Sequence, residues 1–329
     1  MKKLVLNFAL IVFYSSMCCA EVVFLDERAK TYIAEDAKLK TLGSGFKWTE
    51  GPLWVPQMRI LLFSDIPNNT IFQYTENGDI KPYLAPSGAT QLASGDSMQG
   101  SNGLLIDPSG NLLLLQQGDR RVATMQTDIS RPSTSFKTLV SHFEGKRLNS
   151  PNDGVFDSSG NLYFTDPPYG MNGIMDAPNK ALPFQGVYML KPDGELTLID
   201  KSLSFPNGIA LSPEDKTLYV AVSDPEAATW YAYNQDTKTG QWHRQVFFDA
   251  TSYVGKANYQ GYPDGMVVHS SGVIFASGPG GIWLFDNKGT PLAKIFTSKL
   301  TANCTLSADE STLFITAHDT LMSLPLITN

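Results

Sequence analysis

The feature that most constrains the fold of this chain is an apolar, strand-like run that occurs six times. The runs read ILLFSD, LLLLQQ, LYFTD, LYVAVSD, VIFASG and LFITAHD, and they begin at residues 60, 112, 162, 218, 273 and 313. Nearly every run follows a cluster of Pro, Gly, Asp or Ser of the kind that forms hairpin turns. Self-similarity at intervals of 40 to 56 residues indicates a repeat architecture.

A second short apolar segment stands before each turn, and a side chain that bears oxygen stands at its head. These heads are Glu50, Asn102, Asn152 or Asp153, Asn207, Asp264 and Asn303, and five of the six are followed by Gly. Units of paired strands with almost no helical periodicity predict an all-β fold, a six-bladed β-propeller. A β-sandwich would also have many short strands, but it would not place such a side chain at the same phase of all six repeats.

The innermost strands of a propeller begin at one end of its central channel, so we expect the six heads to converge there. All of them offer oxygen, and none offers the nitrogen or sulfur of His or Cys. Oxygen donors with few carboxylates suit one hard divalent cation, for which Ca²⁺ is the leading candidate and Mg²⁺ an alternative. A single Asn-Gly or Asp-Gly is more simply a turn. Six at matched phase favour a shared site.

Other catalytic chemistries find little support in the sequence. There is no G-x-S-x-G nucleophile motif, no phosphate-binding loop and no HExxH pattern. The lone Cys304 is expected to be a buried apolar residue, and Gly95-Asp96-Ser97-Met98 is expected to be a loop. The long insertion from Asp166 to Gly186 could carry an apolar wall over the channel mouth, for which Tyr169, Met171 and Phe184 are the candidates.

The first twenty residues have the pattern of a secretory signal peptide. A basic start, an apolar stretch from Leu4 to Tyr14 and a small-residue exit at Ala20 predict cleavage before Glu21. The alternatives are a retained membrane anchor, for which the apolar run is short, and a lipid on Cys18 or Cys19. We therefore expect residues 21–329 to form a single periplasmic or secreted domain without a membrane span.

The mature chain is expected to be acidic and to lack an internal disulfide. Cleavage would remove two lysines and two of the three cysteines, which leaves 23 basic residues against 32 acidic ones and a formal charge of −9. No stretch is rich in Lys or Arg. This balance argues against nucleic acid and anionic lipid surfaces as partners.

Several motifs resemble, in the family's own order, those of the gluconolactonase branch of the gluconolactonase/senescence-marker-protein (regucalcin) family. The resemblance runs from about residue 34 to 325 and is carried by WTEGPLW (48–54), SPNDG (150–154), YFTDPPYG (163–170), FQGVY (184–188), PNGIALSP (206–213), PDGM (263–266) and TANC (301–304). It implies a six-bladed propeller with one catalytic divalent cation on its axis, usually calcium, and hydrolysis of sugar lactones.

Carried over by motif, the resemblance implies that Glu50, Asn207 and Asp264 are metal ligands. Asn152 matches a ligand in some members and a substrate contact in others. We expect Asn102, Asn303 and Tyr169 to line the site and contact the substrate. One departure concerns the substrate, because regucalcin-like members have Arg where this chain has Ser150.

Water is the expected nucleophile for the lactone carbonyl. Asp264 is the first candidate for the general base that accepts its proton, and Asp153 is the second. A calcium-dependent esterase or organophosphate hydrolase could use the same site. A non-catalytic propeller that binds a ligand is the third alternative.

Overall fold

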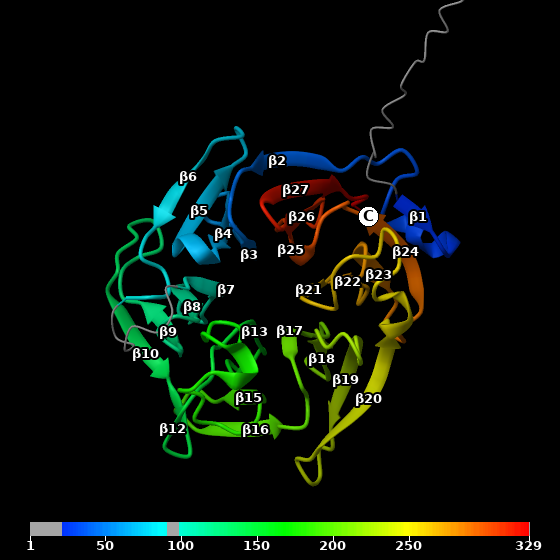
Figure 1. Ribbon diagram of the computed structural model, residues 1–329. Coiled ribbons are helices and arrows are strands. Elements are labelled where there is room, and N and C mark those ends of the chain that lie inside the picture. The colour runs from blue at the N-terminus through cyan, green and yellow to red at the C-terminus, as the bar shows by residue number, and fades with distance from the viewer. Residues whose placement is uncertain (1–21, 91–98, 329) are drawn as a thin grey trace, which may run out of the picture.

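The computed structural model describes residues 22–90 and 99–328, and it confirms the six-bladed β-propeller (Figure 1). Each blade contains an antiparallel sheet whose strands follow one another outward from the axis. Blade 1 is β3 (Thr49–Val55), β4 (Ile60–Asp65), β5 (Thr70–Thr75) and β6 (Ile80–Leu84); blade 2 is β7 (Ser101–Ile106), β8 (Leu112–Gln116), β9 (Arg121–Met125) and β10 (Phe136–Val140); blade 3 is β13 (Gly154–Phe156), β14 (Leu162–Asp166), β15 (Gly186–Leu190) and β16 (Leu196–Asp200).

The second half of the ring repeats this arrangement. Blade 4 is β17 (Pro206–Leu211), β18 (Thr217–Val222), β19 (Thr229–Gln235) and β20 (Trp242–Asp249); blade 5 is β21 (Met266–Val268), β22 (Ile274–Gly278), β23 (Gly281–Phe285) and β24 (Pro291–Phe296); blade 6 is β25 (Thr301–Leu306), β26 (Thr312–Ala317) and β27 (Thr320–Pro325). Outside the blades lie a small hairpin, β11 (His142–Phe143) and β12 (Lys146–Arg147), and the 3₁₀ turns η1 (Glu27–Thr31), η2 (Ile66–Asn68), η3 (Ile174–Asp176) and η4 (Thr251–Tyr253).

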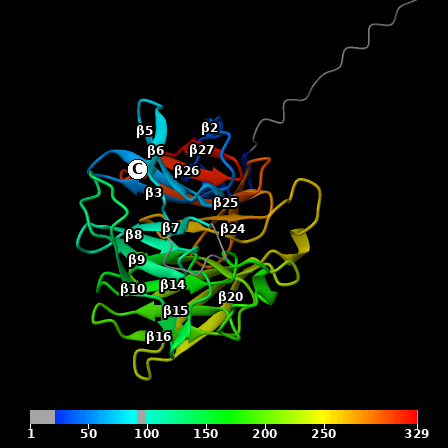
Figure 2. The same ribbon diagram turned by 60° about the vertical axis from the view of Figure 1, so that its left-hand side comes forward.

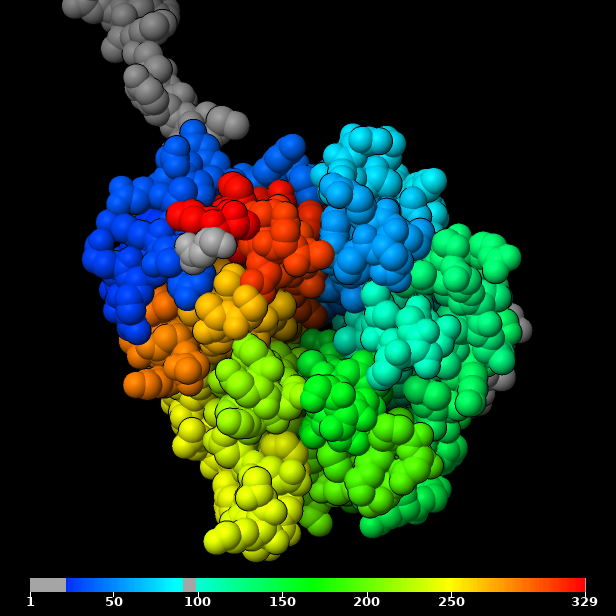
Figure 3. Space-filling model, turned by 180° about the vertical axis from the view of Figure 1, so that it is seen from behind, coloured from blue at the N-terminus to red at the C-terminus, as the bar shows by residue number. Residues whose placement is uncertain are grey.

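Blade 6 is completed from the other end of the chain. Strand β2 (Lys40–Ser44) pairs antiparallel with β27, so one sheet joins both ends of the propeller, and β1 (Val22–Phe24) adds a fifth strand to blade 5. The blue N-terminal segment accordingly lies beside the red C-terminal strands in Figures 1 and 3. The hydrogen bonds of β2 close the ring.

The sequence repeats correspond to the second strand of each blade. Strands β4, β8, β14, β18, β22 and β26 are buried along nearly all of their length. Neighbouring blades pack against one another through shared hydrophobic clusters, and Figure 2 shows blades 2 and 3 side by side. A strand buried on both faces reads as a continuous apolar run, which explains why these segments do not alternate.

Within the described residues, no helix has the length and apolar character needed to cross a bilayer. The predicted signal peptide, residues 1–20, and the loop 95–98 lie outside the described residues.

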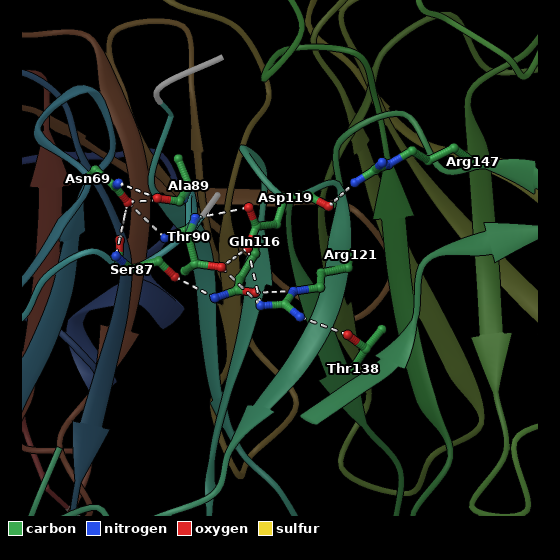
Figure 4. Close-up of polar contacts among 10 residues, drawn as sticks. Asn69, Ser87, Ala89, Thr90, Gln116, Asp119, Arg121, Thr138 and Arg147 are labelled. Carbon is green, nitrogen blue, oxygen red and sulfur yellow. Dashed lines mark hydrogen bonds and ion pairs between the residues drawn. The ribbon is translucent and has the colours of Figure 1, made fainter. Parts of the chain in front are cut away.

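A buried polar network holds residues 87–90, which follow blade 1 (Figure 4). Asp119 accepts hydrogen bonds from the amide and the hydroxyl of Thr90 and pairs with Arg121 at 3.1 Å. Arg121 also donates to Gln116 at 2.6 Å and to Thr138 at 2.8 Å. Both members of the ion pair are almost fully buried, with 1% and 5% of their side chains exposed.

Replacing Asp119 with Ala is expected to lower the free energy of unfolding by about 3–5 kcal/mol, because it leaves the Arg121 guanidinium buried without its counter-charge. Chemical unfolding monitored by circular dichroism measures the change. The matched control is Glu76→Ala, which breaks the exposed Arg59–Glu76 pair and is expected to cost about 0–1 kcal/mol. Equal losses in the two variants would contradict a special role for the buried pair.

Candidate active site

The six predicted heads lie on the innermost strands or just before them, and these strands contact one another in order around the axis. Four heads belong to β3, β7, β17 and β25, and the others lie one or two residues before β13 and β21. The glycines that follow them make room for the next blade. A Cβ at Gly51 would lie 2.0 Å from the carbonyl oxygen of Asn102, and one at Gly208 would lie 2.2 Å from that of Asp264. Any other residue would therefore push adjacent heads apart.

One cavity of about 510 Å³ collects five of these side chains. Glu50, Asn102, Asn152, Asn207 and Asp264 come from five different blades and line this cavity together; below, these five residues are called its floor. The rest of the lining is largely apolar and aromatic, with a few polar groups: Lys47, Trp48, Ile66, Pro67, Gln99, Gln117, Tyr169, Ser223, Gly261, Tyr262, Leu300 and Thr301. Residues more than two hundred positions apart in the sequence thus share one site.

Three side-chain oxygens in this cavity are buried without a hydrogen-bond donor. They are Oδ1 of Asn102, Oδ1 of Asn207 and Oδ1 of Asp264. Buried polar atoms are nearly always paired in folded proteins, so a group of unpaired acceptors calls for a positive or hydrogen-donating partner. No other described side chain supplies one here.

The carboxylates of the site are held in an unfavourable environment. Burial raises the pKa of Glu50 to about 8, although a hydrogen bond from the Gly51 amide, 2.8 Å long, partly offsets it. The pKa of Asp264 is raised well above its usual range, first by burial and then by the charges of Glu50 and Asp153. A divalent positive charge would offset both the burial and the repulsion.

The donor set fits a hard divalent cation. Glu50 and Asp264 would supply charged oxygens, Asn207 an unpaired amide oxygen, and Asn152 lines the same floor. In the part of the chain that the structure describes, no three His, Cys, Asp or Glu side chains gather in a group able to hold a metal. The candidate ligands here are two carboxylates and two amides, and the amides do not belong to that group of side chains. This set of oxygen donors suits calcium better than zinc.

Asp153 and Asn303 line a different cavity of about 220 Å³ that also adjoins the inner strands. Asp153 accepts hydrogen bonds from the Gly154 amide at 2.9 Å and from Asn303 at 3.4 Å, and burial raises its pKa to about 6. The amide oxygen of Asn303 accepts from the Cys304 amide at 2.8 Å, which turns its nitrogen toward the carboxylates. These two residues support the site from beside it.

Of the three residues proposed for the apolar wall, only Tyr169 lines the large cavity. Its ring stacks on Phe205 at 5.8 Å and an interplanar angle of 17°. The proposal was wrong for Met171, which is 4% exposed, and for Phe184, which packs against Phe143. Phe184 also packs against the hydrophobic cluster that blades 2 and 3 share.

Ser150 holds this insertion in place. Its hydroxyl donates to the Pro167 carbonyl at 2.6 Å and accepts from the Gly170 amide at 2.8 Å. Ser150 is fully buried, so it braces the Tyr169 loop and does not line the cavity.

Asp166 at the start of the insertion gives a pH-dependent prediction. Burial raises its pKa to about 7 from 3.8, and its Oδ1 has no partner among the described residues. The stability that follows from protonated Asp166 is fully present below pH 3.8 and is lost as the pH rises through about 7. Relative to Asp166→Asn, the parent should lose roughly 2–3 kcal/mol between pH 5 and pH 8.

Urea unfolding of both proteins at the two pH values tests this prediction, with EDTA present throughout so that cation binding is constant. The other carboxylates titrate in both proteins, so their contribution cancels when the variant is compared with the parent. Parallel pH profiles would show that Asp166 is ionised without penalty.

The sequence analysis missed a set of hydroxyls on the second strands. Ser64 donates to the Asn102 carbonyl at 2.9 Å, Thr165 to the Asn207 carbonyl at 2.6 Å, and Ser277 to the Ala302 carbonyl at 2.7 Å. Each bond joins one blade to the inner strand of the next. The signal was present in the repeats, since Ser or Thr recurs near the end of ILLFSD, LYFTD, LYVAVSD, VIFASG and LFITAHD.

Comparisons with known proteins agree with this arrangement. A family model described as the SMP-30/gluconolactonase/LRE-like region matches residues 48–319. A gluconolactonase of Zymomonas mobilis is 37% identical over 85% of this chain and 78% of its own length. A pentonolactonase of Haloferax volcanii is 26% identical over 81% of this chain and 80% of its own length. The solved structure of a gluconolactonase from Xanthomonas campestris has a TM-score of 0.78 and 29% identity, covering 94% of this chain and 95% of that one.

Proposed function

Because the chain belongs to the SMP-30/gluconolactonase/LRE-like family and is a gluconolactonase-like lactone hydrolase, we propose that it opens sugar lactones with one divalent cation, Ca²⁺, in the large cavity. Glu50, Asn152, Asn207 and Asp264 would hold this cation. The observation that carries the proposal is the convergence of these residues on one floor, with two of their oxygens buried and unpaired.

The cation would supply positive charge that stabilises the oxygen of the lactone carbonyl as it becomes negative. The residues of the chain do the rest. The floor would place oxygens from five blades around the reacting group, and the apolar and aromatic lining would limit the access of water. Held in this way, the ester carbonyl and a single water are brought together without a large loss of entropy during the reaction.

Asp264 is the better placed of the two candidate bases. Asp264 lines the large cavity, and its Oδ1 has no hydrogen bond. With a cation to offset the burial that raises its pKa, its carboxylate would accept a proton from the attacking water. Both oxygens of Asp153 accept hydrogen bonds, and its side chain lines the smaller cavity. These contacts favour Asp264 as the base and a supporting role for Asp153.

The walls suggest how a sugar ring would lie. Tyr169 and Tyr262 present aromatic surface, while the side chain of Gln117 would offer hydrogen bonds to hydroxyl groups. Rings of sugars pack on aromatic faces through their C–H groups, and their hydroxyls need polar partners. A cyclic, hydroxylated ester meets both requirements.

A substrate screen of the purified protein tests the proposal. Gluconolactone, pentonolactones, acyl lactones and a phosphotriester are each followed by acid release with and without added Ca²⁺. We expect Ca²⁺-dependent turnover of aldonolactones at rates well above those of the other classes. A preference for the phosphotriester, or no turnover of any lactone, would contradict the proposed substrate.

A further inference from the structure

We propose that Ser223 is a positioning residue that holds the nitrogen of the Asn207 amide, so that the amide oxygen is left unpaired and available to a cation. The inference rests on the proposed cation site and adds to it the group that determines the orientation of one ligand. Ser223 directly follows β18 and lines the cavity beside Asn207.

The hydrogen-bond geometry fixes the direction of each bond at Ser223. Its hydroxyl lies 2.6 Å from the carbonyl oxygen of Pro263, and that oxygen can only accept, so Ser223 must donate its single proton there. The amide of Asn207 lies 2.9 Å from the same hydroxyl oxygen. Ser223 has no second proton to give, so the Asn207 atom that faces it must be the nitrogen. Oδ1 therefore points the other way.

The rest of Asn207 is held equally firmly. Thr165 donates to its backbone carbonyl at 2.6 Å, which fixes the main chain. The bond to Ser223 then determines which of its two orientations the side-chain amide adopts. The chosen orientation leaves Oδ1 buried and unpaired. An amide turned by 180° would present N–H groups in place of Oδ1, and N–H groups cannot ligate a cation.

Ser223 also connects Asn207 with Asp264. The Pro263 carbonyl that accepts its proton belongs to the residue immediately before Asp264, so one hydroxyl ties the head of blade 4 to the head of blade 5. Ser223 also forms a side-chain hydrogen bond with the Tyr169 hydroxyl, whose pKa is raised mainly by burial. The other blade-joining hydroxyls, those of Ser64, Thr165 and Ser277, bond to backbone carbonyls. Ser223 bonds to a carbonyl and orients a side-chain amide as well.

Calorimetric titration of the purified protein with Ca²⁺ tests this role. We expect Ser223→Ala to weaken the affinity for Ca²⁺ by about tenfold or more, and kcat/KM to fall at limiting Ca²⁺ and recover substantially at saturating Ca²⁺. Ser223→Thr should restore the affinity to within about threefold, because Thr165 occupies the corresponding place in blade 3 and the fold accepts a methyl group there. A purely structural loss would show neither the recovery nor the rescue.

Ser277→Ala is the matched control. It removes a hydroxyl-to-carbonyl bond of similar length, 2.7 Å against 2.6 Å, without touching a side-chain amide. We expect a similar loss of thermal stability in both variants, but a Ca²⁺ affinity within about twofold of the parent for Ser277→Ala. Equal weakening of Ca²⁺ binding in the two variants would overturn the proposal.

A double-mutant cycle with Asn207→Asp isolates the orientation itself. A carboxylate at this position has two equivalent oxygens, so there is no wrong orientation to prevent, and Ser223→Ala should then change the Ca²⁺ affinity by less than about twofold. A full tenfold effect in the Asn207→Asp background would overturn the proposal. If the parent and Ser223→Ala bind Ca²⁺ equally well, only the role of Ser223 is overturned. If the parent binds no Ca²⁺, the cation site is overturned together with it.

Discussion

Replacing Asp264 with Asn is expected to lower kcat for lactone hydrolysis by about 10²–10⁴-fold while the propeller remains folded. The amide keeps the shape of the side chain and one oxygen, but it cannot accept a proton from water. The substitution also removes a carboxylate whose pKa is raised well above its usual range, so it relieves repulsion from Glu50 and Asp153. We therefore expect the cation-free variant to melt at the same temperature as the parent or higher. Initial rates of acid release and thermal unfolding measure the two effects.

Asp153→Asn is the control for Asp264→Asn, because it removes the second candidate base. It is expected to lower kcat by less than tenfold, since the Asp153 oxygens already accept hydrogen bonds from Gly154 and Asn303. If Asp264→Asn kept near-parental turnover while Asp153→Asn lost it, the proton acceptor would be Asp153. If both kept it, neither carboxylate would be the base.

The fold could be predicted because its evidence is local and repeated. Each blade contributes a buried second strand, a turn and a polar head, so six weak signals at one phase support the same architecture. The closure of blade 6 by β2 has no such signal. Its partner β27 lies almost three hundred residues away, and the pairing depends on backbone hydrogen bonds that any exposed strand of suitable length could make.

The site could be predicted in outline but not at the level of individual side chains. Asn152 and Asp153 are adjacent in the sequence, and the phase of the repeat alone did not decide between them. In extended chain, successive side chains point to opposite sides, and the structure places Asn152 at the large cavity and Asp153 at the small one. Met171 and Phe184 show the same limit, because a long insertion gives no periodicity from which to infer which apolar side chains face inward.

The proposed role of Ser223 could not be inferred from the sequence repeats. The recurring Ser or Thr of the second strands could be seen in the sequence, yet five similar hydroxyls invite one common role. Only the distances from Ser223 to Asn207 and Pro263 separate it from Ser277 and Thr165. The same residue type at the same position of the repeat can therefore have the proposed positioning role in one blade and a purely structural role in another.

Removal of divalent cations with EDTA is expected to reduce lactone hydrolysis to the uncatalysed rate, and added Ca²⁺ is expected to restore it. Without a cation, Glu50, whose pKa burial raises to about 8, holds its proton at neutral pH, and the unpaired oxygens of Asn207 and Asp264 lack a positive partner. Ca²⁺ at 100 times its dissociation constant should also stabilise the fold by about 2.7 kcal/mol. Acid release and chemical unfolding measure the two effects on one preparation.

The specificity of this effect depends on two comparisons. EDTA loaded with Ca²⁺ beforehand should not inhibit, which separates cation removal from an action of the chelator on the protein. Glu50→Gln should reproduce the loss of turnover and should require far more Ca²⁺ to recover, because it removes one ligand charge and leaves Asp264 in place. Elemental analysis would show whether the chelated protein is free of metal. If such metal-free protein still hydrolysed lactones, Asn207 and Asp264 would converge on the axis for a reason other than a cation. The hydrolysis would then have to be explained by the side chains of the cavity alone.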